Sequence, residues 1–110
     1  MKERDVTLEL LFRATQKVAD YLSGYSPEQF LADSKTQSAV IMQLVVIGEL
    51  AKKLPDQLKQ NIDLPWKLMA GFRDFAVHEY FELDLQQVWD TASRDVPSVR
   101  EKLGLFLQYK

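Results

Sequence analysis

Residues 35–54, KTQSAVIMQLVVIGELAKKL, decide the fold class of this chain. Their apolar side chains occupy nearly every direction around a helical axis, which predicts a helix that needs more than one neighbour. In a chain of 110 residues, such a helix lies at the centre of its own bundle, against another subunit, or both, and we expect both. Gly48 lowers helix propensity by about 1 kcal/mol relative to alanine, so it indicates either the close approach of another backbone or a tolerated helical glycine.

The rest of the chain shows helical periodicity separated by short turns, without the alternating pattern of strands. Ser26 and Pro27 are typical of a helix start, and we expect Phe30 and Leu31 to pack inward from that short helix. The sequence therefore predicts an all-α, up-and-down helical bundle. Its expected segments are helices at 4–23, 27–32 and 35–54, a polar turn at 56–60, a helix at 66–78, a break at 79–83, and a last helical region at 84–108 that is bent or divided at Pro97.

Composition restricts the class of protein. The 110 residues are 46% hydrophobic, which is enough for one domain with its own core. Without any cysteine, the chain has no disulfide, no thiolate zinc site and no cysteine nucleophile, and we expect a cytoplasmic location. The charged start predicts no secretory signal, and residues 39–51 are too short and too polar to span a membrane, which takes about 20 apolar residues.

The charge of the chain limits how it can bind nucleic acid. A net charge of −2 argues against the broad basic surface that coats a polynucleotide. An RNA site would have to be local, assembled from two chains, or shielded until a partner leaves.

The segment 71–81, GFRDFAVHEYF, holds the strongest candidates for chemistry. His78 is the only histidine, and the end of a helix favours its cationic form, as does Asp74 four residues earlier. Five residues rotate an ideal helix by about 140°, so Arg73 and His78 share a site only if the helix end distorts or if two chains meet across a symmetric interface. Tyr80 returns nearly to the Arg73 face if helical geometry persists.

Two interpretations of this segment remain open from the residues alone. One is a charged helix end without a function. The other is cleavage of an RNA phosphodiester, in which Arg73 neutralises charge on the phosphate oxygens and His78 moves a proton. No HExxH, EF-hand or glycine-rich phosphate loop is present, so we expect neither a metal nor a cofactor. The scattered acidic residues predict solvated helix surfaces, and Trp66 and Trp89 predict core anchors.

Several short motifs in the chain resemble those of a known protein family. Residues 1–110 resemble a single HepT-like domain of the HEPN superfamily along almost their whole length. The motifs that carry the resemblance are Phe30-Leu31-Ala32-Asp33, Ile47-Gly48-Glu49, Pro65-Trp66, Arg73 with His78 and Tyr80, Val88-Trp89, and Asp95-Val96-Pro97.

The resemblance implies a homodimer in which two copies of the motif share a cleft. It further implies that Arg73 and His78 are the catalytic residues of a metal-independent ribonuclease toxin, with attack by the RNA 2′-hydroxyl. Asp74 matches a supporting polar position where asparagine is common in the family. Its additional negative charge either opposes phosphate binding or orients His78.

The resemblance also implies a protein partner. This would be a minimal nucleotidyltransferase (MNT) antitoxin, which in the family silences the toxin by attaching AMP to the motif tyrosine, here Tyr80, and can build higher assemblies. A non-catalytic alternative is a binding module that holds a nucleotidyltransferase or its nucleotide. A third interpretation is a structural dimer in which the motif only caps a helix.

Overall fold

The computed structural model describes residues 3–108, with side chains from residue 6 onward. Within these residues the regular structure is entirely helical, which confirms the predicted all-α class. The elements in chain order are α1 (Glu3–Leu22), α2 (Pro27–Leu31), α3 (Ser34–Lys53), α4 (Asp56–Lys59), α5 (Trp66–His78), the 3₁₀ helix η1 (Tyr80–Glu82), α6 (Leu85–Asp90), the π-helical segment η2 (Thr91–Asp95) and α7 (Val96–Leu107).

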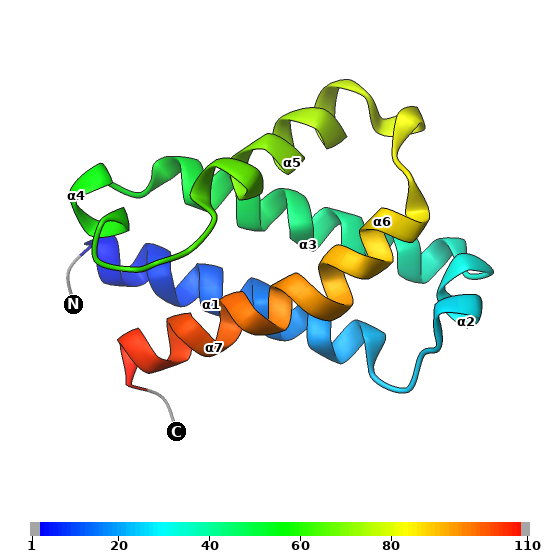
Figure 1. Cartoon of the computed structure of the whole chain (residues 1–110), viewed down its shortest axis with the longest axis horizontal. Coiled ribbons are helices and arrows are strands. Elements are labelled where there is room, and N and C mark those ends of the chain that lie inside the picture. The colour runs from blue at the N-terminus through cyan, green and yellow to red at the C-terminus, as the bar shows by residue number, and fades with distance from the viewer. Residues whose placement is uncertain (1–2, 109–110) are drawn as a thin grey trace.

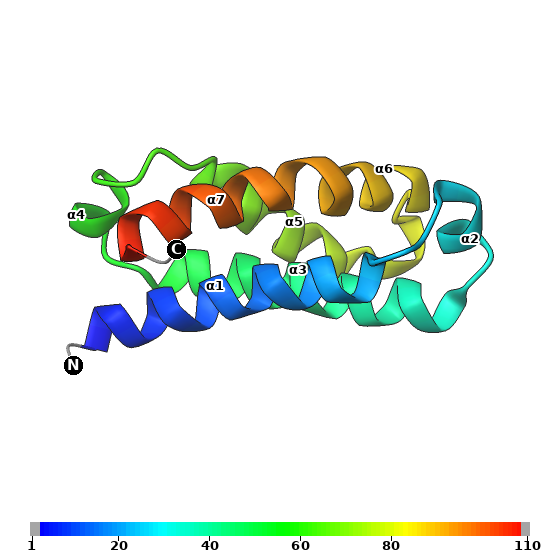
Figure 2. The ribbon, with the colours of Figure 1, turned by 90° about the horizontal axis from the view of Figure 1, so that it is seen from below.

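The long helices run up and down (Figure 1). α1 packs on α3 and on α7, and α3 also packs on α5, so α3 lies between α1 and α5. Successive long segments run in opposite directions along the longest axis of the molecule (Figures 1 and 2). The bundle is flat, with principal extents of 41 × 32 × 20 Å. The predicted central position of α3 is therefore confirmed, and α5 flanks the bundle.

Local capping signals fix where α2 and α3 begin. Ser26 and Gln29 form a reciprocal capping box at the start of α2, as the serine and proline there predicted. Asp33 caps α3 by accepting the Thr36 N–H, and it also accepts the Tyr25 hydroxyl at 2.6 Å. Hydrogen bonds from Tyr25 and then from Thr36 lower the pKa of Asp33 to about 2.

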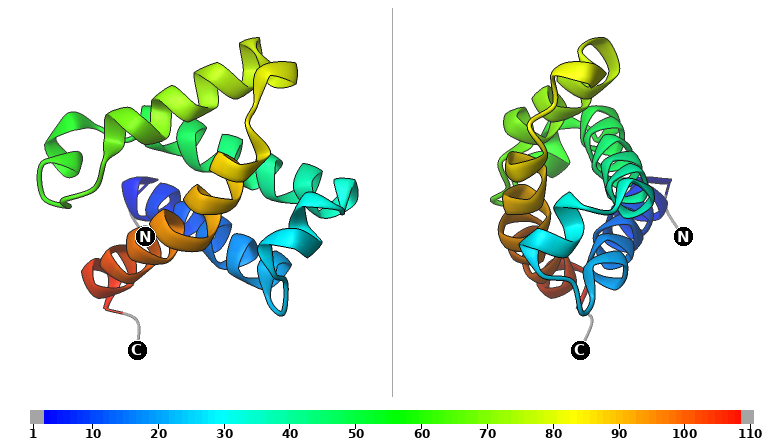
Figure 3. Two further views of the ribbon diagram at one scale, coloured as in Figure 1. Left: turned by 45° about the vertical axis from the view of Figure 1, so that its right-hand side comes forward. Right: turned by 90° about the vertical axis from the view of Figure 1, so that its right-hand side faces the viewer.

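The core lies between α1, α3, α6 and α7, with α2 covering one end (right view of Figure 3). Phe30 is fully buried, and its ring lies 5.5 Å from that of Trp89. The expectation that Leu31 also packs inward is wrong, since its side chain is 42% exposed. A five-residue helix can turn only one narrow face toward the core, and Phe30 occupies that face.

The last helical region departs from regular geometry before Pro97 rather than at it. Residues Thr91–Asp95 form a π-helical segment, and α7 begins immediately afterwards with Pro97 in its first turn. Proline has no N–H to donate to the preceding turn, and a wider turn accommodates that loss without ending the helix. None of the described helices is both long and apolar enough to cross a membrane.

Candidate active site

The two ends of α5 are fixed by different contacts. At its start, the Trp66 indole Nε1 donates to the carbonyls of Lys59 and Ile62, both at 3.1 Å, which confirms Trp66 as an anchor. At its end, the Glu79 N–H donates to the Phe75 carbonyl at 2.7 Å, and the backbone leaves helical geometry at Glu79. The helix is therefore regular from Trp66 through His78, as predicted.

Gly48 allows α3 and α5 to approach closely enough to position Arg73. A Cβ at position 48 would lie 2.5 Å from the Met69 carbonyl oxygen and would collide with the Arg73 Cβ. Such contact is possible only without a side chain, so the predicted close backbone approach is confirmed. The base of the Arg73 side chain is thereby held against α3.

Two carboxylates contact the Arg73 guanidinium. Its Nε lies 2.9 Å from Oε1 of Glu49 on α3, and its Nη1 donates to Oδ1 of Asp74 at 3.0 Å. The buried Nε makes an ion pair with Glu49 rather than an aligned hydrogen bond. Glu49 and Asp74 thus fix the orientation of the guanidinium.

Asp74 binds two cations and does not bind His78. Its Oδ1 accepts hydrogen bonds from Lys52 Nζ at 2.9 Å and from Arg73 Nη1 at 3.0 Å. These bonds, the Lys52 one first, lower the pKa of the Asp74 carboxyl. Of the two roles open to Asp74, orientation of His78 has no contact to support it among the described residues.

His78 is exposed on a different side of α5 from Arg73. The regular helix keeps the two side chains about 140° apart around the axis, because the distortion that could have brought them together is absent. Among the described contacts of one copy, none joins Arg73 to His78.

The condition for Tyr80 to return to the Arg73 face is not met. That expectation required continuous helical geometry, whereas α5 ends at His78 and Tyr80 begins the separate helix η1. η1 lies at the outer edge of the molecule, where the chain turns from α5 to α6 (Figure 1 and left view of Figure 3). The Tyr80 side chain is 46% exposed, and the Phe81 ring meets it edge-on at 5.6 Å.

An exposed apolar stripe follows α5 and includes His78. Its members recur at spacings of three and four residues, which places them on one side of the helix. They are Leu68, Gly71, Phe75 and His78. Leu68 is 76% exposed and Phe75 is 45% exposed. We call these four residues the α5 stripe.

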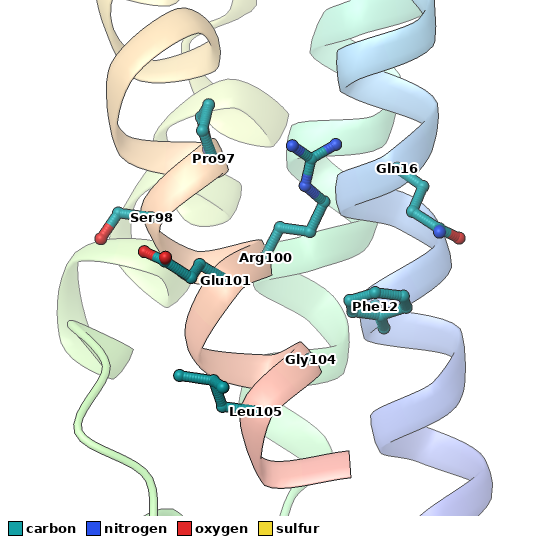
Figure 4. Close-up of a pocket in the computed structure, with 8 residues that line it drawn as sticks. All are labelled: Phe12, Gln16, Pro97, Ser98, Arg100, Glu101, Gly104 and Leu105. Atoms are coloured by element: carbon teal, nitrogen blue, oxygen red, sulfur yellow. The ribbon is translucent and has the colours of Figure 1, made fainter. Parts of the chain in front are cut away.

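One surface hollow lies away from these residues. A shallow groove of about 670 Å³ runs between α1 and α7, and Phe12, Gln16 and Arg100 are among the residues that line it (Figure 4). None of the four candidate site residues lines this groove, so it does not form part of the site. Within the described chain, no three His, Asp or Glu side chains are grouped so that they could hold a metal ion.

Comparison with known proteins identifies the family. The family described as "Ribonuclease HepT-like" matches residues 11–105. This chain belongs to the HepT-like family of the HEPN superfamily. No solved structure matches it.

Several HepT-like relatives match most of the chain. "Probable ribonuclease HepT" of Thermococcus cleftensis is 38% identical over 96 residues, covering 86% of this chain and 87% of the relative. "Putative RNase MJ0127" of Methanocaldococcus jannaschii is 37% identical over 101 residues, covering 89% and 84%. "Putative RNase TTE0752" of Caldanaerobacter subterraneus subsp. tengcongensis is 30% identical over 109 residues, covering 98% and 97%.

Two residues beside the HepT-like motif were not singled out as members of the site from sequence. Glu49 and Lys52 lie one turn apart on α3 and reach Arg73 and Asp74 on α5. Acidic residues were expected on solvated helix surfaces, whereas Glu49 contacts a cation across a helix interface. Their position around Gly48 was a usable signal, because charged residues beside a close helix crossing can reach the partner helix.

Proposed function

We propose that this chain is a metal-independent endoribonuclease whose active site forms between two copies. Arg73 and His78 are its catalytic residues, Asp74 supports Arg73, and RNA is the substrate. The observation that carries the proposal is that a regular α5 keeps Arg73 and His78 apart within one chain while His78 lies in an exposed apolar stripe. The family and the names of the relatives support the activity.

The chemistry needs only groups that this site and RNA supply. The RNA 2′-oxygen attacks the adjacent phosphorus, and the bond from phosphorus to the 5′-oxygen breaks, leaving a 2′,3′-cyclic phosphate and a 5′-hydroxyl. His78 takes part in moving the proton from the attacking 2′-hydroxyl to the leaving 5′-oxygen. Arg73 donates hydrogen bonds to the phosphate oxygens as negative charge builds on them.

A two-fold contact through the α5 stripe would bring the two copies of His78 together, and Arg73, which faces α3, would reach the shared site from beside that contact. A symmetric interface brings the same surface of both copies together, so it would bury both His78 side chains near the axis. Exposed apolar residues such as Leu68 and Phe75 are the kind of surface that an interface covers. A site completed by a second chain is also compatible with the net charge of −2. Such a site needs positive charge only at the cleft, not a broad basic surface.

The first experiment is cleavage of a mixed RNA substrate in EDTA by the wild type, Arg73→Ala and His78→Ala, after circular dichroism shows that all three are folded. Loss of each catalytic group is expected to lower the rate by roughly 10² to 10⁴. Intact RNA with the wild type would overturn the ribonuclease proposal and favour a partner-binding module.

A mixing experiment tests whether the site is shared. Heterodimers of Arg73→Ala and His78→Ala contain one site with both groups intact if the two groups come from different chains. Equal mixing with subunit exchange should then restore roughly a quarter of wild-type activity, because half of the dimers have one working site of two. No recovery would mean that each chain builds its own site.

We further propose that the chain is the toxin of a toxin–antitoxin pair with an MNT-type nucleotidyltransferase. Tyr80 is half-exposed on η1, two residues beyond His78, where a transferred AMP would place bulk and negative charge beside the site. Co-expression with a minimal nucleotidyltransferase tests the pairing. Mass spectrometry should then show AMP on Tyr80, and RNA cleavage should fall.

A further inference from the structure

Two ion pairs cross from α3 to α5 one helical turn apart. Glu49 contacts Arg73 at 2.9 Å, and Lys52 contacts Asp74 at 2.9 Å. Arg73 also contacts Asp74, so the four side chains form one continuous network. Glu49 and Lys52 project from successive turns of the same side of α3.

The balance of charge in this network depends on Lys52. Arg73 alone would face two carboxylates, Glu49 and Asp74, giving the group a net charge of −1. A negative cluster a few Å wide repels a phosphate, and the repulsion is not fully screened at so short a distance. With Lys52 the charge of the network is zero, and the guanidinium can meet a phosphate without a surplus of negative charge.

The position of Lys52 matches this role. Its Nζ and the Arg73 Nη1 both donate to the same oxygen, Oδ1 of Asp74. Lys52 therefore competes directly with Arg73 for the charge of that carboxylate. The next residue, Lys53, is exposed and makes no ion pair with any residue whose side chain the structure describes, so proximity in sequence alone does not confer the contact.

We propose that Lys52 is a positioning residue of the ribonuclease site, which offsets the charge of Asp74 so that Arg73 remains available to an RNA phosphate. The inference rests on the proposed function. The inference gives the negative charge of Asp74 a compensating cation within reach.

Steady-state RNA cleavage at low salt tests this role in Lys52→Ala, Lys52→Arg and the control Lys53→Ala. Lys52→Ala should raise KM by about fivefold with a smaller change in kcat, because the surplus negative charge weakens phosphate binding. Lys52→Arg should restore the wild-type KM, and Lys53→Ala should match the wild type. Equal KM values for Lys52→Ala and Lys53→Ala would overturn the inference.

A double-mutant cycle separates an indirect role from a direct phosphate contact. If Lys52 acts through Asp74, then Lys52→Ala should have little effect on KM in an Asp74→Asn background. An undiminished effect in that background would overturn the inference, because Lys52 would then be contacting RNA itself.

A final measurement does not depend on activity. The carboxyl carbon of Asp74, followed by NMR, should titrate at higher pH in Lys52→Ala than in the wild type, and Lys53→Ala should leave it unchanged. An unchanged Asp74 titration in Lys52→Ala overturns the inference while leaving the ribonuclease proposal intact. Intact RNA with the wild type overturns the ribonuclease proposal itself, and the role of Lys52 fails with it.

Discussion

Gly48 on α3 lies directly against Arg73 on α5, so a residue without a side chain seats the base of the candidate catalytic arginine. The contact joins the helix packing to the site, because the same crossing places Glu49 beside the guanidinium. Any change in the spacing of α3 and α5 would displace Arg73.

Gly48→Ala should therefore be destabilising despite the better helix propensity of alanine. Propensity favours alanine by about 1 kcal/mol, but forcing a methyl group into the crossing costs about 1–3 kcal/mol and displaces Arg73. Chemical denaturation should show a lower free energy of unfolding, and RNA cleavage should fall with it.

Gly71→Ala is the matched control for packing within one chain, and because Gly71 belongs to the α5 stripe, both glycine variants are compared in the monomeric Phe75→Asp background. Gly71 is also helical, but apart from its chain neighbours and the nearby backbone of its own helix, no heavy atom lies within 4 Å of the position of its Cβ. It should gain about 0.5–1 kcal/mol in the free energy of unfolding. Equal effects at the two glycines would contradict the importance of the crossing.

A charge in the α5 stripe should separate the two copies of the chain. Phe75→Asp puts a carboxylate on an exposed apolar surface. The carboxylate stays hydrated in the free monomer, but burying it in an interface has a large cost in free energy. Light scattering should show a monomer, and RNA cleavage should be lost. Leu105→Asp, at an exposed position on α7, is the control and should remain dimeric. A dimeric Phe75→Asp would place the interface elsewhere.

Tyr80→Phe should separate regulation from catalysis. Removing the hydroxyl removes the acceptor for a transferred nucleotide, whereas Arg73 and His78 remain in place. RNA cleavage should stay within a few-fold of the wild type, and the nucleotidyltransferase should no longer label or silence the chain. Tyr21→Phe, a partly exposed tyrosine on α1, should still be labelled and silenced. Labelling of Tyr80→Phe would direct the search to another residue.

Asp33 should contribute to acid stability. Its pKa is lowered from 3.8 to about 2 in the folded chain, so its contribution to stability is fully present above about pH 4 and is lost as the pH falls toward 2. Asp33→Asn keeps an N-cap but removes the charge, so its melting temperature should fall less steeply than that of the wild type across this range. Asp20→Asn, at an exposed position on α1, should follow the wild-type curve.

Most of the fold could be predicted from the sequence because local signals mark it. Periodic apolar residues gave the long helices, and Ser26 with Pro27 marked the start of α2. α5 spans residues 66–78 as expected. The inward packing of Leu31 failed, because local periodicity in a five-residue helix does not fix which single direction faces the core.

The site was less predictable because its contacts join residues far apart in the chain. Arg73, His78 and Tyr80 were proposed from their motif, but the pairing of Glu49 with Arg73 depends on how α3 crosses α5. Likewise, the contacts of Asp74 with Lys52 and Arg73 depend on this crossing and could not be read from the motif. Helical periodicity predicts each helix and its apolar face, but it does not predict which residues of two packed helices lie opposite each other.

The marginal place of α5 in the core has an evolutionary consequence. Ala76 is the one residue of α5 that is fully buried, while the central core lies among the other helices. Substitutions along the outer side of α5 therefore sacrifice little folding energy. Exposed residues of this helix can therefore change while the packing of the remaining scaffold is kept, so one framework can carry different surfaces along α5.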